Sequence, residues 1–552
     1  MIKTGCCSYL TCIKSWICLG HKIRLRRHSH VFHGLSPLLR IETGIIVASE
    51  TIASSALLRD TSKPHSVLSI SMTILPAFKR ACQLLLFSLF VALPASAKDP
   101  ITEGETSPVM LDLDPYLIDA LYGKESGGKT GRFGKEGGMA NLLEEPAFVE
   151  LVKKHDLKLF NGPVIGDIKP TSAKFWVRSA GPATVQIQVG DLTSDSVQTS
   201  ETNDFTAVMT VEELKPFTDH AYSVLVNGET IQQDTFNFRT APEKGQKVEF
   251  HVTFGSGSRY VPVNEHAWST MSKQRPLAYL GLGDNVYIDV VDHRGAQRFF
   301  YYRRYLSPAY AELAAGSALY GIWDDHDMAM NDDSGGAGMK YSWKRPNWKV
   351  FTENWNNPHY GGGEEMPGTW HSFSLGDVDF FMTDGRFYRD KGEKTMLGPD
   401  QKKWLMEELA KATGKFKVIA SGTMFADGAD KDGKDSWAGD WSREERDEIF
   451  DLITENKIDG VLLIAGDRHR SDIWKIERPG YPLYEFVSAK VTNMHTHKTY
   501  KNAVWSYNTG NFWGQLNFDL RPDDPVMIFR CVDISGEVVK EFPVELSEIS
   551  HQ

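Results

Sequence analysis

The pattern of apolar and polar residues changes character about halfway along the chain. In the first half, the runs Ala173–Arg178 and Thr184–Val189 alternate apolar and polar residues, which is the period of half-buried strands. Further apolar-rich runs of strand length are Phe205–Val211, Ala221–Val226 and Phe236–Thr240. Short strands separated by turns predict a small all-β sandwich domain over residues 161–242, followed by a linker.

From residue 248 onward, apolar strands alternate with helical segments. The expected strands are Val248–Phe254, Leu277–Leu282, Leu319–Trp323, Phe416–Ser421 and Gly460–Ala465, with a hairpin over Phe373–Thr383. The expected helices are Arg294–Tyr305, Pro399–Lys411 and Ser442–Asn456. Glu445 stands at capping-box spacing from Ser442. The alternation predicts an α/β domain with buried strands over residues 247–552.

Residues 98–160 form a separate N-terminal segment of mixed character. Gly123–Gly138 is rich in glycine and lysine and predicts a flexible loop. Glu145–His155 has helical spacing. Nothing in this segment suggests chemistry.

Residues 72–97 have the pattern of a secretory signal peptide. Lys79 and Arg80 precede the apolar stretch Ala81–Leu93, and Ala95-Ser-Ala97 is a small-residue cleavage site. A membrane anchor is the alternative, but a span needs about 20 apolar residues. The pattern predicts export to the periplasm or the cell exterior, with no stable membrane anchor.

Residues 1–71 are not expected before a signal peptide. Either translation starts at Met72 and the upstream part is an extension of the gene model, or the leader is unusually long. Five of the six cysteines precede Ala97, so Cys531 is the one cysteine after the predicted cleavage site and has no partner there for an intrachain disulfide.

Charge excludes one broad class of function. Residues 1–97 hold 11 Lys and Arg against 3 Asp and Glu, while the whole chain has a formal net charge of −11. The acidic excess therefore lies after residue 97. A nucleic-acid binder needs a basic face, so no nucleic-acid partner is expected. No Gly-x-Ser-x-Gly elbow of a serine hydrolase is present either.

Acidic and histidine clusters recur directly after apolar strands. They are Gly283-Asp-Asn-Val-Tyr287, Trp323-Asp-Asp-His-Asp327, Asp384-Gly-Arg-Phe-Tyr-Arg389 and Gly466-Asp-Arg-His469. Ligands of α/β sheets bind outside the carboxyl ends of strands. A single Gly-Asp is often only a turn or a helix cap. Four such clusters in order instead predict one site.

These residue types suit the hydrolysis of a phosphoester. Two metal ions about 3.5–4 Å apart neutralise the phosphate and lower the pKa of a water for in-line attack. Hard ions favour carboxylate oxygens, and iron and zinc also accept imidazole. Such a site needs a bridging aspartate, further aspartate or histidine ligands, and a histidine near the leaving oxygen.

The ordered motifs resemble those of the PhoD-like alkaline phosphatases, within the calcineurin-like metallophosphatase superfamily. Leu397–Leu405, Asp435–Trp441 and Tyr484–Ser488 add to the resemblance, which covers roughly residues 161–545. It implies a four-layer α/β metallophosphatase sandwich, in which mixed β-sheets are flanked by helices. The segment Leu214–Thr218, ahead of Tyr222, resembles a turn of fibronectin type III domains. This resemblance suggests that the small β-sandwich ahead of the metallophosphatase domain is fibronectin-III-like.

The resemblance also implies roles for individual residues. Asp284 would bridge two metals, and His326 would stabilise the transition state or protonate the leaving oxygen, while a metal-bound hydroxide attacks phosphorus. The implied remaining metal ligands are Tyr287, Asp325, Asp467 and His469. Arg386, Arg389 and Ser256 are candidates for contacts to the phosphate. For the two arginines, an ion pair that holds the loop is an equal alternative.

One position departs from the family pattern. The family places a cysteine ligand of the ferric ion shortly after the first strand, and here Gly257 stands at that place, within Thr253–Arg259. The family implies iron and calcium, but without the thiolate manganese or zinc become alternatives.

Three interpretations of function remain open on these residues. The first is an alkaline phosphatase that acts on phosphate monoesters, diesters or both. The second is a phosphodiesterase or phospholipase-type enzyme that acts on lipids or cell-wall polymers. The third is a degenerate, non-catalytic cell-surface binding protein, which Gly257 favours and the remaining acidic and histidine positions oppose. His495, His497, Trp437 and Trp441 are expected at the rim of the site or in the core.

Overall fold

The computed structural model describes residues 107–123, 131–231, 236–428 and 433–552. The predicted signal peptide at residues 72–97 and the segment before it lie outside the described residues.

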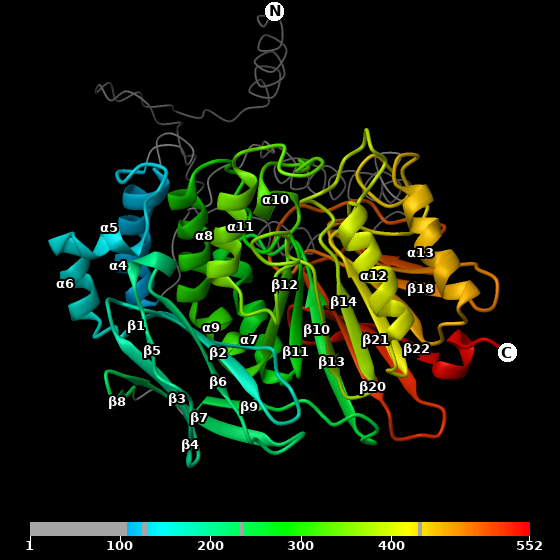
Figure 1. The fold of residues 1–552 in the computed structure, drawn as a ribbon, viewed down its shortest axis with the longest axis horizontal. Helices are drawn as coiled ribbons and strands as arrows, with labels where there is room; N and C mark the ends of the chain where they lie inside the picture. The colour runs from blue at the N-terminus through cyan, green and yellow to red at the C-terminus, as the bar shows by residue number, and fades with distance from the viewer. Residues whose placement is uncertain (1–106, 124–130, 232–235, 429–432) are drawn as a thin grey trace, which may run out of the picture. The chain divides into compact units, whose positions relative to one another are not determined.

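The first of two large sheets has nine strands in the order β22-β21-β20-β10-β11-β12-β1-β2-β6 (Figure 1). They are β1 (Leu159–Gly166), β2 (Ala173–Ser179), β6 (Thr206–Val211), β10 (Glu249–Gly255), β11 (Ala278–Leu282), β12 (Ala318–Ile322), β20 (Phe512–Asp519), β21 (Val526–Asp533) and β22 (Val538–Glu545). The neighbours β10, β11 and β12 run parallel, so their carboxyl ends meet at one edge.

The second large sheet has seven strands in the order β13-β14-β15-β16-β18-β17-β19. They are β13 (His371–Leu375), β14 (Val378–Met382), β15 (Phe416–Ser421), β16 (Val461–Ala465), β17 (Ser471–Ile476), β18 (Leu483–Ser488) and β19 (Trp505–Tyr507). Strands β14, β15, β16 and β18 are parallel. Every residue of β15 and β16 is buried, as expected for strands covered on both faces.

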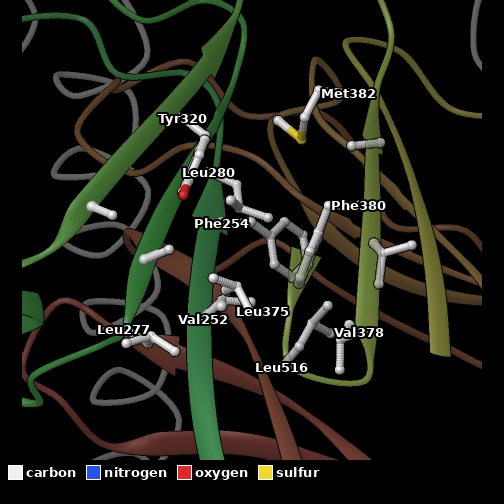
Figure 2. Packing of buried hydrophobic residues seen from close by; sticks show 14 of the residues in the cluster. Val252, Phe254, Leu277, Leu280, Tyr320, Leu375, Val378, Phe380, Met382 and Leu516 are labelled. Atoms are coloured by element: carbon white, nitrogen blue, oxygen red, sulfur yellow. The ribbon is translucent and has the colours of Figure 1, made fainter. Parts of the chain in front are cut away.

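The two large sheets pack face to face through apolar side chains. Figure 2 shows Val252, Phe254 and Leu280 of the first sheet beside Phe380 and Val378 of the second. These side chains are at most 1% exposed. This shared core fixes the position of one sheet relative to the other.

Helices accompany both sheets (Figure 1). Those beside the first sheet are α7 (His266–Lys273), α8 (Arg294–Leu306), α9 (Pro308–Gly316) and α11 (Lys344–Asn354); those beside the second are α12 (Pro399–Lys411) and α13 (Arg443–Glu455). The short helix α10 (Asp325–Met328) follows β12. The N-terminal segment adds α4 (Pro108–Leu117), the π-helix η2 (Ile118–Tyr122), α5 (Met139–Leu143) and α6 (Pro146–Lys154). Of the described helices, none is both long enough and apolar enough to cross a membrane.

A third, antiparallel sheet completes an N-terminal β-domain. Its strands are β3 (Thr184–Val189), β4 (Leu192–Thr193), β5 (Val197–Gln198), β7 (Asp219–Val226), β8 (Glu229–Thr230) and β9 (Phe236–Arg239). The other strands of this domain, β1, β2 and β6, belong to the nine-stranded sheet. Strand β1 pairs in parallel with β12, with Ile165 opposite Ala318. The β-domain therefore shares a sheet with the α/β domain.

Most of the elements predicted from the sequence are confirmed, and one local prediction is wrong. Ser442 makes no side-chain cap bond at the start of α13. Glu445 instead accepts hydrogen bonds from Thr395 Oγ1 and from the main-chain N–H of Met396. Of the predicted flexible loop Gly123–Gly138, residues 124–130 lie outside the described residues. In the described remainder Gly295 N donates to Lys135 O at 2.9 Å, and the flexibility of the loop stays a prediction.

Candidate metal centre

Polar loops from both large sheets converge at the carboxyl ends of their parallel strands. The first sheet contributes the loops after β10, β11 and β12, and the second contributes those after β14, β15 and β16. Crevices at this edge of α/β sheets are the usual place for a ligand. All four sequence clusters lie in these loops.

The loop after β11 presents Asp284 and Tyr287. Both have left-handed backbone, with φ of 53° and 54°, and the loop turns at Gly283. Asp284 is 1% exposed, and its Oδ2 accepts a hydrogen bond from the Tyr287 hydroxyl at 2.8 Å. Asp284 Oδ1 is buried and has no hydrogen-bond partner among the described residues. Burial raises the pKa of this carboxyl well above its usual value.

The loop after β12 brings Asp325 and His326 beside Asp284. Asp325 Oδ2 accepts from Asp332 N at 2.6 Å. The His326 ring stacks on Tyr287 at 4.5 Å between centroids, and its Nδ1 lies 2.5 Å from Asp289 Oδ1. Burial opposes protonation of His326, but the Asp284 and Asp289 carboxylates outweigh it and raise its pKa to about 11. The cluster therefore attracts positive charge.

The loop after β16 supplies Asp467 and His469. Asp467 Oδ2 lies 3.0 Å from Thr423 Oγ1 and 2.9 Å from Arg468 Nη2. His469 Nδ1 lies 3.0 Å from His495 O, and Nε2 lies 3.1 Å from the Tyr287 hydroxyl. Because a carbonyl only accepts, Nδ1 is the protonated nitrogen, and Nε2 presents its lone pair to the centre. Burial lowers the pKa of His469 to about 3, so the imidazole is neutral.

The residues present fit a metal ion. One possible ligand atom from each of Asp284, Asp325 and His326 lies within 4.8 Å of the others. An unpaired buried carboxylate oxygen is costly unless a cation or a donor compensates it, which applies to Asp284 Oδ1. Carboxylate, imidazole and phenol donors suit divalent manganese, zinc or iron. Asp325 also belongs to a second acidic group, with Asp332 and Asp435.

Ser256 and Gly257 support the site from the loop after β10. Ser256 is fully buried, and its Oγ accepts a hydrogen bond from Asp467 N at 3.2 Å. Gly257 has φ +66°, and a Cβ built there would lie 2.7 Å from Lys490 N. The close approach of the Lys490 backbone thus leaves no room for a side chain at position 257. A Ser256 contact to phosphate stays a prediction.

Arg386 and Arg389 are fully buried within ion pairs. Arg386 Nη2 donates to Asp324 Oδ2 at 3.0 Å, and its Nη1 donates to Asp435 Oδ1 at 3.0 Å. Arg389 Nη1 also pairs with Asp435. This geometry corresponds to the ion-pair alternative for both arginines, while a direct contact to phosphate stays a prediction.

Several residues of the site were not singled out from the sequence. Asp327 accepts from the main-chain N–H of Asn285 at 2.8 Å and of Val286 at 3.0 Å, which ties the loop after β11 to the loop after β12. Asp289 and Thr423 are further examples. Asp327 was visible within the cluster Trp323–Asp327, but no sequence signal showed what it contacts.

Of the residues expected at the rim of the site or in the core, the two histidines are at least partly exposed and Trp437 is buried. His495 is exposed, and its ring centroid lies 5.0 Å from that of His469. His497 is partly exposed, at 5.4 Å from His469. Trp437 is fully buried and stacks on Phe425, so it belongs to the core.

The two-sheet fold with this convergent acidic and histidine site defines a metallophosphatase-like protein. Residues 252–521 match the model of the PhoD-like phosphatases, and residues 156–241 match a domain of unknown function, DUF7800. The α/β part of the chain is thus similar to the PhoD-like phosphatases, and this confirms the resemblance predicted from the sequence motifs.

Individual relatives are distant. Alkaline phosphatase D of Bacillus subtilis (strain 168) is 23% identical over 287 residues, which cover 42% of this chain and 48% of that protein. The match thus spans about half the length of this curated relative. A solved structure of PhoD superposes with a TM-score of 0.58 at 16% identity, covering 70% of this chain and 89% of that one. A purple acid phosphatase from yellow lupin (Lupinus luteus) seeds gives 0.52 at 13% identity, covering 69% and 74%. These structures show the shared fold.

Proposed function

We propose that this protein is an exported, metal-dependent phosphoester hydrolase. The observation that carries the proposal is the buried Asp284 carboxylate, whose Oδ1 has no hydrogen-bond partner in the described part of the chain, beside Asp325 and His326. A buried group of carboxylates without enough positive charge is a site for cations. The match of residues 252–521 to the PhoD-like phosphatases supports phosphoesters as substrates.

Asp284, Tyr287, Asp325, Asp467 and His469 would hold the metal ions. Metal ions supply charge neutralisation at the phosphate and a lowered pKa of water, which makes hydroxide available at neutral pH. With Gly257 at the family's cysteine position and its space filled by Lys490, we propose manganese or zinc as well as the family's iron and calcium.

His326 would act on the oxygen of the leaving group. Its Nδ1 is engaged by Asp289, so Nε2 is the nitrogen that can hold and transfer a proton. The stacked Tyr287 ring keeps the imidazole in its plane. Because His469 is neutral, it does not need to change protonation during turnover.

Turnover of chromogenic phosphate esters tests the function directly. The purified chain is treated with a chelator and assayed on p-nitrophenyl phosphate and bis-p-nitrophenyl phosphate, with Mn²⁺, Zn²⁺, Fe²⁺ and Ca²⁺ added singly and in pairs. We expect activity that disappears on chelation and returns with metal. The ratio of monoester to diester turnover separates a phosphatase from a phosphodiesterase.

Asp284→Asn should lower kcat at least about 100-fold and reduce the bound metal, since the amide offers one oxygen where the carboxylate would offer two to the metal ions. Asp191→Asn, in an exposed turn after β3, is the matched control and should behave like the wild type. Full activity of Asp284→Asn, or a wild type that neither binds metal nor hydrolyses either ester, would contradict the proposal. The second result would favour a binding protein.

A further inference from the structure

A buried network of arginines and aspartates joins the two halves of the metal centre. At its middle lies Asp435, which precedes α13. Its Oδ1 accepts from Arg386 Nη1 at 3.0 Å and from Arg389 Nη1, and its Oδ2 accepts from Arg386 Nη2 at 3.1 Å. The side chains of Asp435, Arg386, Arg389 and Asp324 are at most 2% exposed. Buried charges of this kind need complete pairing.

Through Arg386, Asp435 faces the loop after β12. Arg386 Nη2 lies 3.0 Å from Asp324 Oδ2 but 3.7 Å from Asp325 Oδ1, so the guanidinium binds the neighbour of the proposed ligand and stays farther from the ligand itself. A guanidinium that moved closer to Asp325 would compete with a cation for its oxygens.

Through its main chain, Asp435 faces the loop after β16. The Thr423 hydroxyl lies 2.9 Å from Asp435 O and 3.0 Å from Asp467 Oδ2. Arg468 Nη2 also donates to Asp435 O and pairs with Asp467 at 2.9 Å. Asp435 therefore contacts Arg386, which lies near Asp325 in the loop after β12. It also contacts Thr423 and Arg468, which lie beside Asp467 in the loop after β16.

We propose that Asp435 is a positioning residue of the metal centre. Its carboxylate holds Arg386 against Asp324 and away from Asp325. Its carbonyl positions Arg468, which pairs with Asp467, and lies beside the Thr423 hydroxyl, which contacts both Asp435 and Asp467. This role rests on the proposed metal site. The competing possibility is that Asp435 is itself a ligand, because an oxygen of it lies within 4.8 Å of oxygens of Asp325 and Asp332. Both Asp435 oxygens are already engaged by guanidinium groups, which favours the positioning role.

The variant Asp435→Asn tests this role, because it keeps the shape and removes the charge. We expect Arg386 to turn toward Asp325, and the dissociation constant for Mn²⁺ to rise about 10- to 100-fold, as for other residues that orient metal ligands. The number of Mn²⁺ ions bound at saturation should stay unchanged, and kcat should recover at saturating Mn²⁺. Titration calorimetry of the chelated full chain gives affinity and stoichiometry together.

Two further variants keep the experiment decisive. Glu353→Gln removes a carboxylate that pairs with Arg298 outside the metal centre, at 3.0 Å, and should leave Mn²⁺ affinity unchanged. Thr423→Val removes only the hydroxyl and should weaken Mn²⁺ binding about fivefold, as expected for one hydrogen bond. It stands in if Asp435→Asn does not fold.

Wild-type Mn²⁺ affinity in both Asp435→Asn and Thr423→Val would overturn the positioning role. Loss of one bound ion per chain in Asp435→Asn would overturn it as well, since that result identifies Asp435 as a ligand. A wild type that binds neither Mn²⁺ nor Zn²⁺ would instead refute the proposed metal site itself, so the two failures are distinguishable.

Discussion

At the scale of single residues, the side chains of the candidate site are held in one orientation by hydrogen bonds and ring contacts. His326 has one ring nitrogen held by Asp289 at 2.5 Å, and its ring is fixed by Tyr287. Asp289 itself is 37% exposed, and its Oδ1 contacts the His326 imidazole. A carboxylate on one nitrogen sets the tautomer and orientation of the other.

Replacing Asp289 with Asn tests this dependence. Asn can still contact His326 Nδ1, but it no longer stabilises the imidazolium, so kcat should fall about 10- to 100-fold with little change in KM. Steady-state kinetics at saturating metal measures both parameters. Asp191→Asn serves again as the control, and an Asp289→Asn enzyme with unchanged kcat would show that His326 needs no carboxylate partner.

At the scale of elements, the site depends on tight turns that follow buried strands. The loop after β10 turns at Gly257 and receives hydrogen bonds from the chain after β18, since Lys490 N donates to Ser256 O at 2.8 Å and Asn493 N donates to Gly257 O at 3.0 Å. Glycine is needed there because of its positive φ and because another backbone lies in contact.

The variant Gly257→Ala should be destabilised by more than the cost of a left-handed alanine, which is about 1–2 kcal/mol. The added Cβ would meet Lys490 N at 2.7 Å and Lys490 Cα at 3.0 Å. Gly510→Ala is the matched control, because Gly510 has φ +68° and nothing within 4 Å of its built Cβ. Urea unfolding of both variants isolates the contact contribution, and equal losses would contradict a steric role for Lys490.

At the scale of the molecule, the β-domain and the α/β domain share the nine-stranded sheet and one apolar core. Ile187 on β3 and Leu280 on β11 belong to the same buried cluster. Strands that belong to one sheet and one apolar core are expected to open as one cooperative unit. The β-domain is therefore part of the framework that holds β12 and its loop.

A cavity in the β-domain should consequently weaken the metal centre's framework. Ile187 is fully buried, and Ile187→Ala should cost about 2–5 kcal/mol. We expect one unfolding transition, shifted for all probes alike. Hydrogen exchange of the β3 and β11 amides should accelerate in parallel. Two separate transitions, with β11 protection unchanged, would show that the β-domain unfolds by itself.

The sequence determined the elements and the class of chemistry. Strand and helix periodicity located β3, α12 and β15 with their observed bounds, because local burial patterns leave a direct trace in the chain. The ordered clusters that contain Asp284, Asp325 and His469 revealed the similarity to the PhoD-like phosphatases, because a metal site requires particular donor types.

Only the tertiary structure decided how these parts combine. The pairing of β1 with β12 depends on a contact between distant segments that no local pattern records. The surroundings of Arg386 were equally undetermined, because an arginine after a strand suits either a phosphate or a carboxylate. Its burial between Asp324 and Asp435 follows from the packing of the two sheets, which brings three loops of different strands together.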